Sequence, residues 1–152
     1  FQLEVAGFPG PVRRAALPVG WANLRDLKAR CEALAPFAQE GTAAFASFAS
    51  LAQSAKRIGN ILKDEVPSEH FDAATLKEDE EKTLAVHLGQ IESTPDHGAL
   101  LAELAALADP LAAFFDAVMV KCEEPALRAA RLSLLRRLQR AFLRVADFSQ
   151  WQ

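Results

Sequence analysis

The sequence contains no tyrosine, one methionine and only two cysteines among its 152 residues. Alanine and leucine dominate instead, which favours helices over sheets. Half of the residues are apolar, so the chain is long enough for one ordinary hydrophobic core and short for two. We therefore expect an all-α fold built as a single bundle of about six helices.

Long apolar runs and targeting signals are also lacking. No uninterrupted apolar run approaches the roughly 20 residues that cross a bilayer, and the first residues lack the order of a signal peptide. We expect a soluble, cytoplasmic protein without a membrane partner. The chain begins without methionine, as a piece of a longer polypeptide would. Cys31 and Cys122 are far apart and outside any metal-like spacing, so reduced thiols are expected.

Apolar periodicity and proline positions divide the chain. Residues 1–20 are interpreted as a lead-in from a preceding part of a longer subunit, and residues 21–152 as the helical domain. Three helix starts are predicted from proline at the first helical position, at Pro95, Pro110 and Pro125. Residues 64–75 are expected to be an irregular connection. The predicted helices are 21–34, 37–63, 78–91, 95–108, 110–121 and 125–147.

Charge is segregated along the sequence. Residues 64–92 hold nine acids against Lys77 and Lys82, whereas the segment from Pro125 onward holds six arginines against Asp147. Such segregation favours a polyanionic partner on one side of the molecule. The alternative is that the acidic helix lies beside the basic one in the fold.

The last predicted helix has an apolar stripe and, opposite to it, a basic ridge. We define the basic ridge as Arg136, Arg137, Arg140 and Arg144. The planar guanidinium group donates two parallel hydrogen bonds, which suits phosphate, so the ridge is a candidate for following an RNA backbone.

Arg131 falls inside the apolar stripe of the same helix, where a charge needs a partner. The preceding helix offers Asp116, which is flanked by large apolar residues. We expect a structural ion pair between Asp116 and Arg131.

A second basic cluster lies near the end of the second predicted helix. It consists of Lys56, Arg57, Asn60 and Lys63. Cations there suit phosphate, and the amide of Asn60 suits a base edge. The alternative is that the cations only complement the negative end of the helix dipole.

Groups for catalysis are few. His70, His87 and His97 show no metal-ligand spacing, and the sequence has no HExxH, no glycine-rich phosphate loop and no serine in a nucleophile turn. The acids of residues 78–81 are interpreted as a helix start, where the dipole favours negative charge. Catalysis by this chain alone is not expected, and neither is a metal site.

Two separated strings carry a family resemblance. PLAAFFDAVMV followed by EEPALRAARLSLLRRLQRAFLRVADF resembles the C-terminal end of the β subunit of bacterial glycyl-tRNA synthetases, and AKRIGNILK resembles another signature of that subunit. The resemblance runs from about Ala16 to the last residue. The ALR of residues 126–128 is similar to the helical anticodon-binding domain that arginyl-tRNA synthetases share.

The resemblance implies an all-helical domain that binds the anticodon region of glycine tRNA. It implies a parent glycine–tRNA ligase of α2β2 composition in the bacterial cytoplasm, whose α subunit uses ATP and Mg, with no cofactor in this domain. The positions it matches are Lys56, Arg57, Asn60, Lys63, Asp116, Arg128, Arg131 and the arginines that follow. Two alternatives are a non-catalytic helical protein-interaction module and the equivalent domain of an arginyl-tRNA synthetase.

Overall fold

The computed structural model describes residues 7–20, 23–65 and 71–151. This part of the chain contains six α-helices, four short 3-10 turns and no strand, which confirms the predicted all-α class. The predicted helix start at Trp21 and residues 66–70 of the predicted connection lie outside the described residues. The helices are α2 (Gly10–Ala16), α3 (Leu24–Leu34), α4 (Ala43–Leu62), α5 (Asp79–Ser93), α6 (His97–Ala117) and α7 (Pro125–Leu143).

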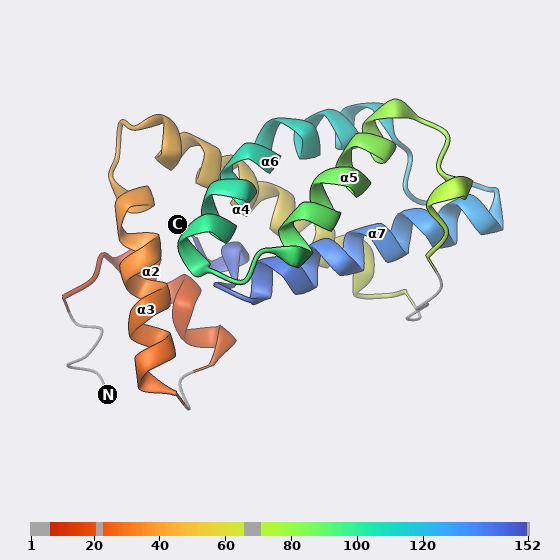
Figure 1. Ribbon diagram of the computed structural model, residues 1–152. Coiled ribbons are helices and arrows are strands. Elements are labelled where there is room, and N and C mark those ends of the chain that lie inside the picture. Colours follow the sequence, from red (N-terminus) through yellow and green to blue (C-terminus); the bar gives the residue numbers. More distant parts are fainter. Residues whose placement is uncertain (1–6, 21–22, 66–70, 152) are drawn as a thin grey trace.

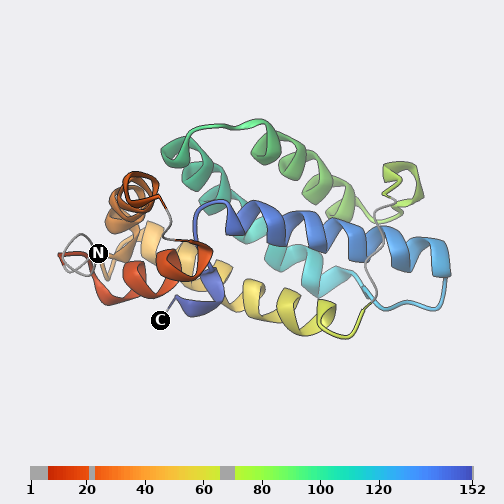
Figure 2. The same ribbon diagram turned by 90° about the horizontal axis from the view of Figure 1, so that it is seen from below.

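Helices α4 to α7 form the larger part of the molecule, and α2 and α3 lie at one end of it (Figure 1). Figure 2 shows α7 between α4 and α5, with α6 behind it. The contacts agree, since α6 packs on both α4 and α5, and α7 also contacts both. Helix α7 therefore presents one side to the core and the other to the face seen in Figure 2.

Side-chain caps explain several helix starts. Thr42 caps α4 by accepting from the backbone N–H of Phe45 at 3.1 Å. Helix α7 begins at Pro125 as predicted, since proline is tolerated in the first turn. Helix α6 begins at His97 and is capped by Asp96, so the predicted start at Pro95 is wrong by two residues.

The predicted start at Pro110 is wrong, because α6 runs unbroken through it. Proline in a helix interior removes one hydrogen bond and crowds the carbonyl four residues earlier. Leucines on both sides, Leu107 and Leu111, are fully buried on one stripe, and their shared burial holds the two halves in one helix. The helix is long and apolar enough to cross a membrane by length and composition, but it packs here as a core helix against α4 and α5.

The predicted lead-in contains α2, whose Val12, Ala15 and Ala16 are fully buried. The 3-10 turn η4 (Phe148–Gln150) returns to this end, where the N–H of Asp147 donates to the Ala15 carbonyl at 2.7 Å. Residues 10–19 thus contribute to the core, and the domain boundary at residue 20 stays a prediction.

A buried arginine holds this end together. Arg30 is 2% exposed, and it donates to the carbonyls of Ala16 at 2.8 Å, Gly20 at 2.6 Å and Val145 at 3.1 Å. Its Nε also donates to Asp26 at 2.9 Å. Sequence reasoning missed Arg30, because nothing local separates it from a solvated helix arginine.

Both cysteines are free thiols, as predicted. Cys31 is fully buried in the core, and burial raises the pKa of its thiol.

Candidate nucleic-acid interface

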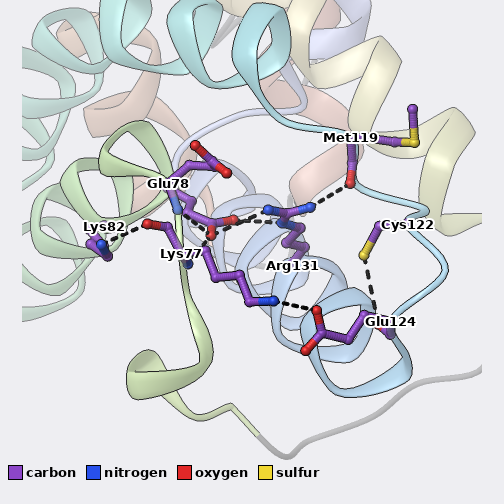
Figure 3. Close-up of polar contacts among 8 residues, drawn as sticks. Lys77, Glu78, Lys82, Met119, Cys122, Glu124 and Arg131 are labelled. Atoms are coloured by element: carbon purple, nitrogen blue, oxygen red, sulfur yellow. Dashed lines mark hydrogen bonds and ion pairs between the residues drawn. The ribbon is translucent and has the colours of Figure 1, made fainter.

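The arginines of α7 are placed first by contacts within the protein. Arg131 is buried, as predicted, but its partner is Glu81 of α5, with 2.6 Å from Nε to Oε2. Its Nη1 donates to the Met119 carbonyl at 2.8 Å, which Figure 3 shows. The predicted ion pair with Asp116 is wrong, because Asp116 is exposed in the last turn of α6 and Glu81 takes its place.

Glu81 is fully buried and accepts two further hydrogen bonds at the start of α5. The backbone N–H of Glu78 donates to it at 2.9 Å, and the N–H of Lys77 also donates. Burial raises the pKa of Glu81, but the bonds from Arg131 and the two N–H groups outweigh it and hold the pKa below its usual value. The predicted capping role of this acidic start is confirmed, and the same carboxylate also anchors α7.

Two members of the basic ridge, Arg137 and Arg144, contact the C-terminal end of α5. Arg137 pairs with Glu92, and its guanidinium lies 4.7 Å from the centre of the Phe71 ring. Arg144 donates to the carbonyls of Ile91 at 3.1 Å and Thr94 at 2.6 Å, at the end of α5. The acidic helix therefore lies beside the basic one, which was the alternative explanation of the segregated charge.

On its other side, α7 reaches the residues that follow α4. Arg136 donates to the backbone carbonyl of Glu65 at 2.8 Å. The Glu65 carboxylate pairs with Lys121 at 3.0 Å and Arg128 at 2.8 Å, and these bonds lower its pKa. Two cations thus share one carboxylate, and a third, Arg136, binds the backbone of the same residue.

Arg140 differs from the other members of the basic ridge. It is exposed and has no hydrogen bond or ion pair within the described part of the chain. It is the ridge member whose guanidinium is available to an outside ligand.

The second cluster, on α4, is mostly without partners. Lys56, Asn60 and Lys63 are exposed, and their side chains make no hydrogen bond or ion pair with any described residue. Arg57 points elsewhere, since its guanidinium lies 4.4 Å from the centre of the Phe115 ring on α6. The sequence-predicted cluster is therefore divided between two surfaces.

A groove of about 610 Å³ lies between the second half of α4 and the end of α7. We call it the α4–α7 groove. Lys56 and Asn60 line one wall, and Gln139 and Leu143 line the other. Sequence reasoning missed Gln139, although it lies one turn from Arg136 on the exposed side of α7. The remaining lining residues are Ala55, Ile58, Gly59, Phe142, Ala146, Asp147, Phe148, Ser149 and Gln150.

Two hollows lie on opposite sides of α7. A depression of about 290 Å³ lies on the α5 side of α7 and is lined by Glu92, Arg137, Arg140, Ala141 and Arg144. The α4–α7 groove lies on the other side, at Gln139 and Leu143. Gln139 lines one hollow and Arg140, the next residue in the sequence, lines the other, so the two hollows are separated by α7 itself.

Cations without an acidic partner are chemically suited to phosphate, and amides without a hydrogen bond are suited to base edges. Asp147 is the one carboxylate that lines the α4–α7 groove, and its Oδ1 accepts from the N–H of Ser149 at 3.0 Å and from the Ser149 hydroxyl at 2.5 Å. Among the described residues no group of three His, Cys, Asp or Glu side chains is placed to hold a metal ion.

The profile of the DALR anticodon binding domain family matches residues 51–145. The chain belongs to this family. The matched segment of the DALR domain begins within α4 and ends just after α7, so it contains the α4 cluster, the basic ridge and the helices between them.

The chain is also similar to curated relatives. It is 43% identical to the glycine–tRNA ligase beta subunit of Methylobacillus flagellatus over 84% of this chain and 18% of that protein. It is 42% identical to the beta subunit of Leptothrix cholodnii over 98% of this chain and 22% of that protein. The Escherichia coli beta subunit is 40% identical over 84% of this chain and 19% of its own length. The chain thus spans about a fifth of these relatives, and the resemblance drawn from the sequence motifs is confirmed.

Proposed function

We propose that the DALR domain binds the anticodon region of glycine tRNA as part of the β subunit of a glycine–tRNA ligase. One observation supports this most directly. Within the family-matched segment, Lys56, Asn60 and Lys63 are exposed on one helix without a partner among the described residues. Side chains left unpaired beside a groove are available to the phosphates and bases of a single-stranded loop.

The proposal extends to the parent enzyme. Its relatives are named as beta subunits of a ligase, and we infer an α2β2 complex in the bacterial cytoplasm. Glycine activation with ATP and Mg would take place in the α subunit, and this domain would contribute RNA binding without a cofactor of its own.

The contacts divide the candidate residues into two groups. Lys56, Lys63 and Arg140 are proposed to hold phosphate, because their charges are unpaired within the described structure. Arg136, Arg137 and Arg144 are engaged with α5 or with Glu65. These three would contribute to the positive electrostatic potential and to the shape of this face of α7. Their direct contact with RNA would be secondary.

Arg57 and Asn60 take different parts in this proposal. The guanidinium of Arg57 already covers the Phe115 ring, so stacking a base on its other face would extend an existing pair. Asn60 faces the groove, where its amide can meet a base edge.

The test is binding of a glycine tRNA anticodon stem-loop to the 152-residue chain over a salt series. Three neutralised phosphates in a single strand give a slope of about −2 in log K against log salt. Lys56→Ala and Lys63→Ala should each make the slope shallower by about 0.7. Arg25→Ala is the matched control, since Arg25 is exposed on the distant helix α3 and should leave the slope unchanged.

Two results would overturn the proposal. One is the absence of binding by the unsubstituted chain at low salt. The other is equal binding of every stem-loop regardless of its loop sequence, which would reduce the interaction to general attraction of RNA by positive charge.

A further inference from the structure

We infer that the α4–α7 groove holds one unpaired RNA base, whose edge is read by the amides of Asn60 and Gln139. This inference rests on the proposed RNA function and specifies where within the domain a loop base is recognised.

Two amides from different helices line the groove. Asn60 comes from α4 and Gln139 from α7, and neither has a hydrogen bond within the described structure. A carboxamide offers two donor hydrogens and an acceptor oxygen on one planar group. That set matches the adjacent donors and acceptors on the edge of a base, and asparagine and glutamine form such paired bonds in nucleic-acid complexes.

Apolar surface beside the amides can cover the flat face of a base. Leu143 is 42% exposed and lines the groove, and the buried rings of Phe142 and Phe148 lie at its floor. Contact with an apolar partner removes this leucine side chain from water, which is favourable in free energy. The groove volume of about 610 Å³ lies within the roughly 300–1,000 Å³ range of ligand sites.

A cation is positioned where the backbone of that nucleotide would pass. Lys56 lies one helical turn before Asn60 on α4, and both line the same wall. Arg140 lines the depression on the α5 side of α7 instead, so Lys56 is the cation of this groove. An unpaired base in the groove would therefore have the positive charge of Lys56 beside it for a phosphate.

The charge pattern favours RNA over a peptide as the occupant. Among the described residues, the groove is lined by Lys56 and by the neutral amides of Asn60, Gln139 and Gln150, while the carboxylate of Asp147 accepts hydrogen bonds from Ser149. A peptide of mixed charge would gain less from this lining than a polyanion with hydrogen-bonding edges.

The experiment crosses abasic substitution in the RNA with alanine substitution in the protein. Each loop nucleotide of the anticodon stem-loop is replaced in turn by an abasic one, and the dissociation constant is measured for every combination. For the unsubstituted chain, one position should weaken binding about tenfold, the size of one stacked or bidentate base contact. In Asn60→Ala and Gln139→Ala, loss of that same base should have almost no further effect.

Controls separate this inference from a general loss of affinity. Gln53→Ala removes an exposed amide on the same helix outside the groove, and should keep the tenfold abasic effect. Asn60→Ala should leave the salt slope unchanged, because it removes no charge, whereas Lys56→Ala should make it shallower. Unchanged melting curves for all variants would show that the groove substitutions act on binding.

The inference is overturned if no abasic position weakens binding, or if Asn60→Ala and Gln139→Ala both retain the full abasic effect. In either case a normal salt slope would leave the proposed RNA function standing. If the unsubstituted chain binds no stem-loop at low salt, the proposed function and this inference fail together. Displacement of bound RNA by an unstructured polar peptide of neutral charge, at comparable concentration, would also count against the inference.

Discussion

Arg131 of α7 donates through Nε to Oε2 of Glu81 over 2.6 Å, and both side chains are buried. The same carboxylate accepts the backbone N–H of Glu78 at the start of α5. One carboxylate therefore completes the cap of one helix and neutralises the buried charge of another. Glu81 is the partner of Arg131 in place of the expected Asp116. This buried pair stabilises the domain and is distinct from the side chains proposed to contact RNA.

Glu81→Ala should lower the free energy of unfolding by about 3–5 kcal/mol, because it leaves the Arg131 charge buried without a partner. Asp116→Ala is the matched control. Its side chain is exposed, so its cost should stay within about 0.5 kcal/mol. Urea denaturation followed by circular dichroism measures both. Equal costs for the two variants would contradict the assigned pairing.

Acid should weaken the fold through the same carboxylate. The pKa of Glu81 is lowered in the folded state, so its contribution is complete above the unfolded pKa and is lost as the pH falls through the folded value. The free energy of unfolding should therefore begin to fall below about pH 4.3, the ordinary glutamate value. Urea titrations from pH 6 down to pH 3 would measure this loss.

The double variant Glu81→Leu with Arg131→Met serves as the control for the acid loss. It removes the titrating carboxylate and its partner together, and a well-packed apolar pair can replace a buried ion pair at little cost. Its stability should fall less steeply with acid than that of the unsubstituted chain. An identical acid slope in the two proteins would show that other carboxylates dominate.

Arg30→Met should be strongly destabilising despite similar side-chain length. The carbonyls of Ala16 and Val145 would each lose a buried donor, at about 1–3 kcal/mol for each unsatisfied group. A total of at least about 2 kcal/mol is expected by the same reasoning. Thermal melts would compare it with Arg25→Ala on the same helix, which is exposed and should change Tm little. Similar melting temperatures for both would contradict the role of Arg30.

Pro110→Ala should stabilise the domain, by up to about 3 kcal/mol, since proline in a helix interior costs that much relative to alanine. The gain comes from restoring one backbone hydrogen bond in α6 and relieving a steric contact. Pro125→Ala is the control, because proline in the first turn of α7 carries no such cost. A loss of stability in Pro110→Ala, measured by urea denaturation, would mean that the ring fills space that alanine leaves empty.

Alanine substitutions at Arg140 and Arg144 should have different effects on RNA binding and on stability. Arg144→Ala removes two bonds to the carbonyls of Ile91 and Thr94, and we expect a cost of about 1 kcal/mol. Arg140→Ala removes no bond within the described structure, so it should leave stability within about 0.5 kcal/mol while making the salt slope shallower. Thermal denaturation measures the stability of each variant, and RNA titrations over a salt series measure its slope. The reverse pattern would contradict the division of the basic ridge.

Helix positions were predictable where the sequence carries a local signal. The caps and proline at the starts of α5 and α7 gave boundaries within about one residue of those observed. Pro110 gave the same local signal and was misleading, because the burial of Leu107 and Leu111 on one stripe overrides a single lost hydrogen bond. Arg30 gave no signal, since its acceptors are backbone carbonyls far away in the sequence.

The sequence by itself determined the all-α class, the family resemblance and the fact that Arg131 is buried and must be paired. Helical periodicity is a local property, so it fixes which side of a helix each residue occupies. The tertiary structure alone decided that Glu81 is the partner of Arg131, that Arg137 and Arg144 contact the end of α5, and that Gln139 and Asn60 line one groove. Periodicity contains no information about which helix lies opposite a given side, because packing between distant segments makes that choice.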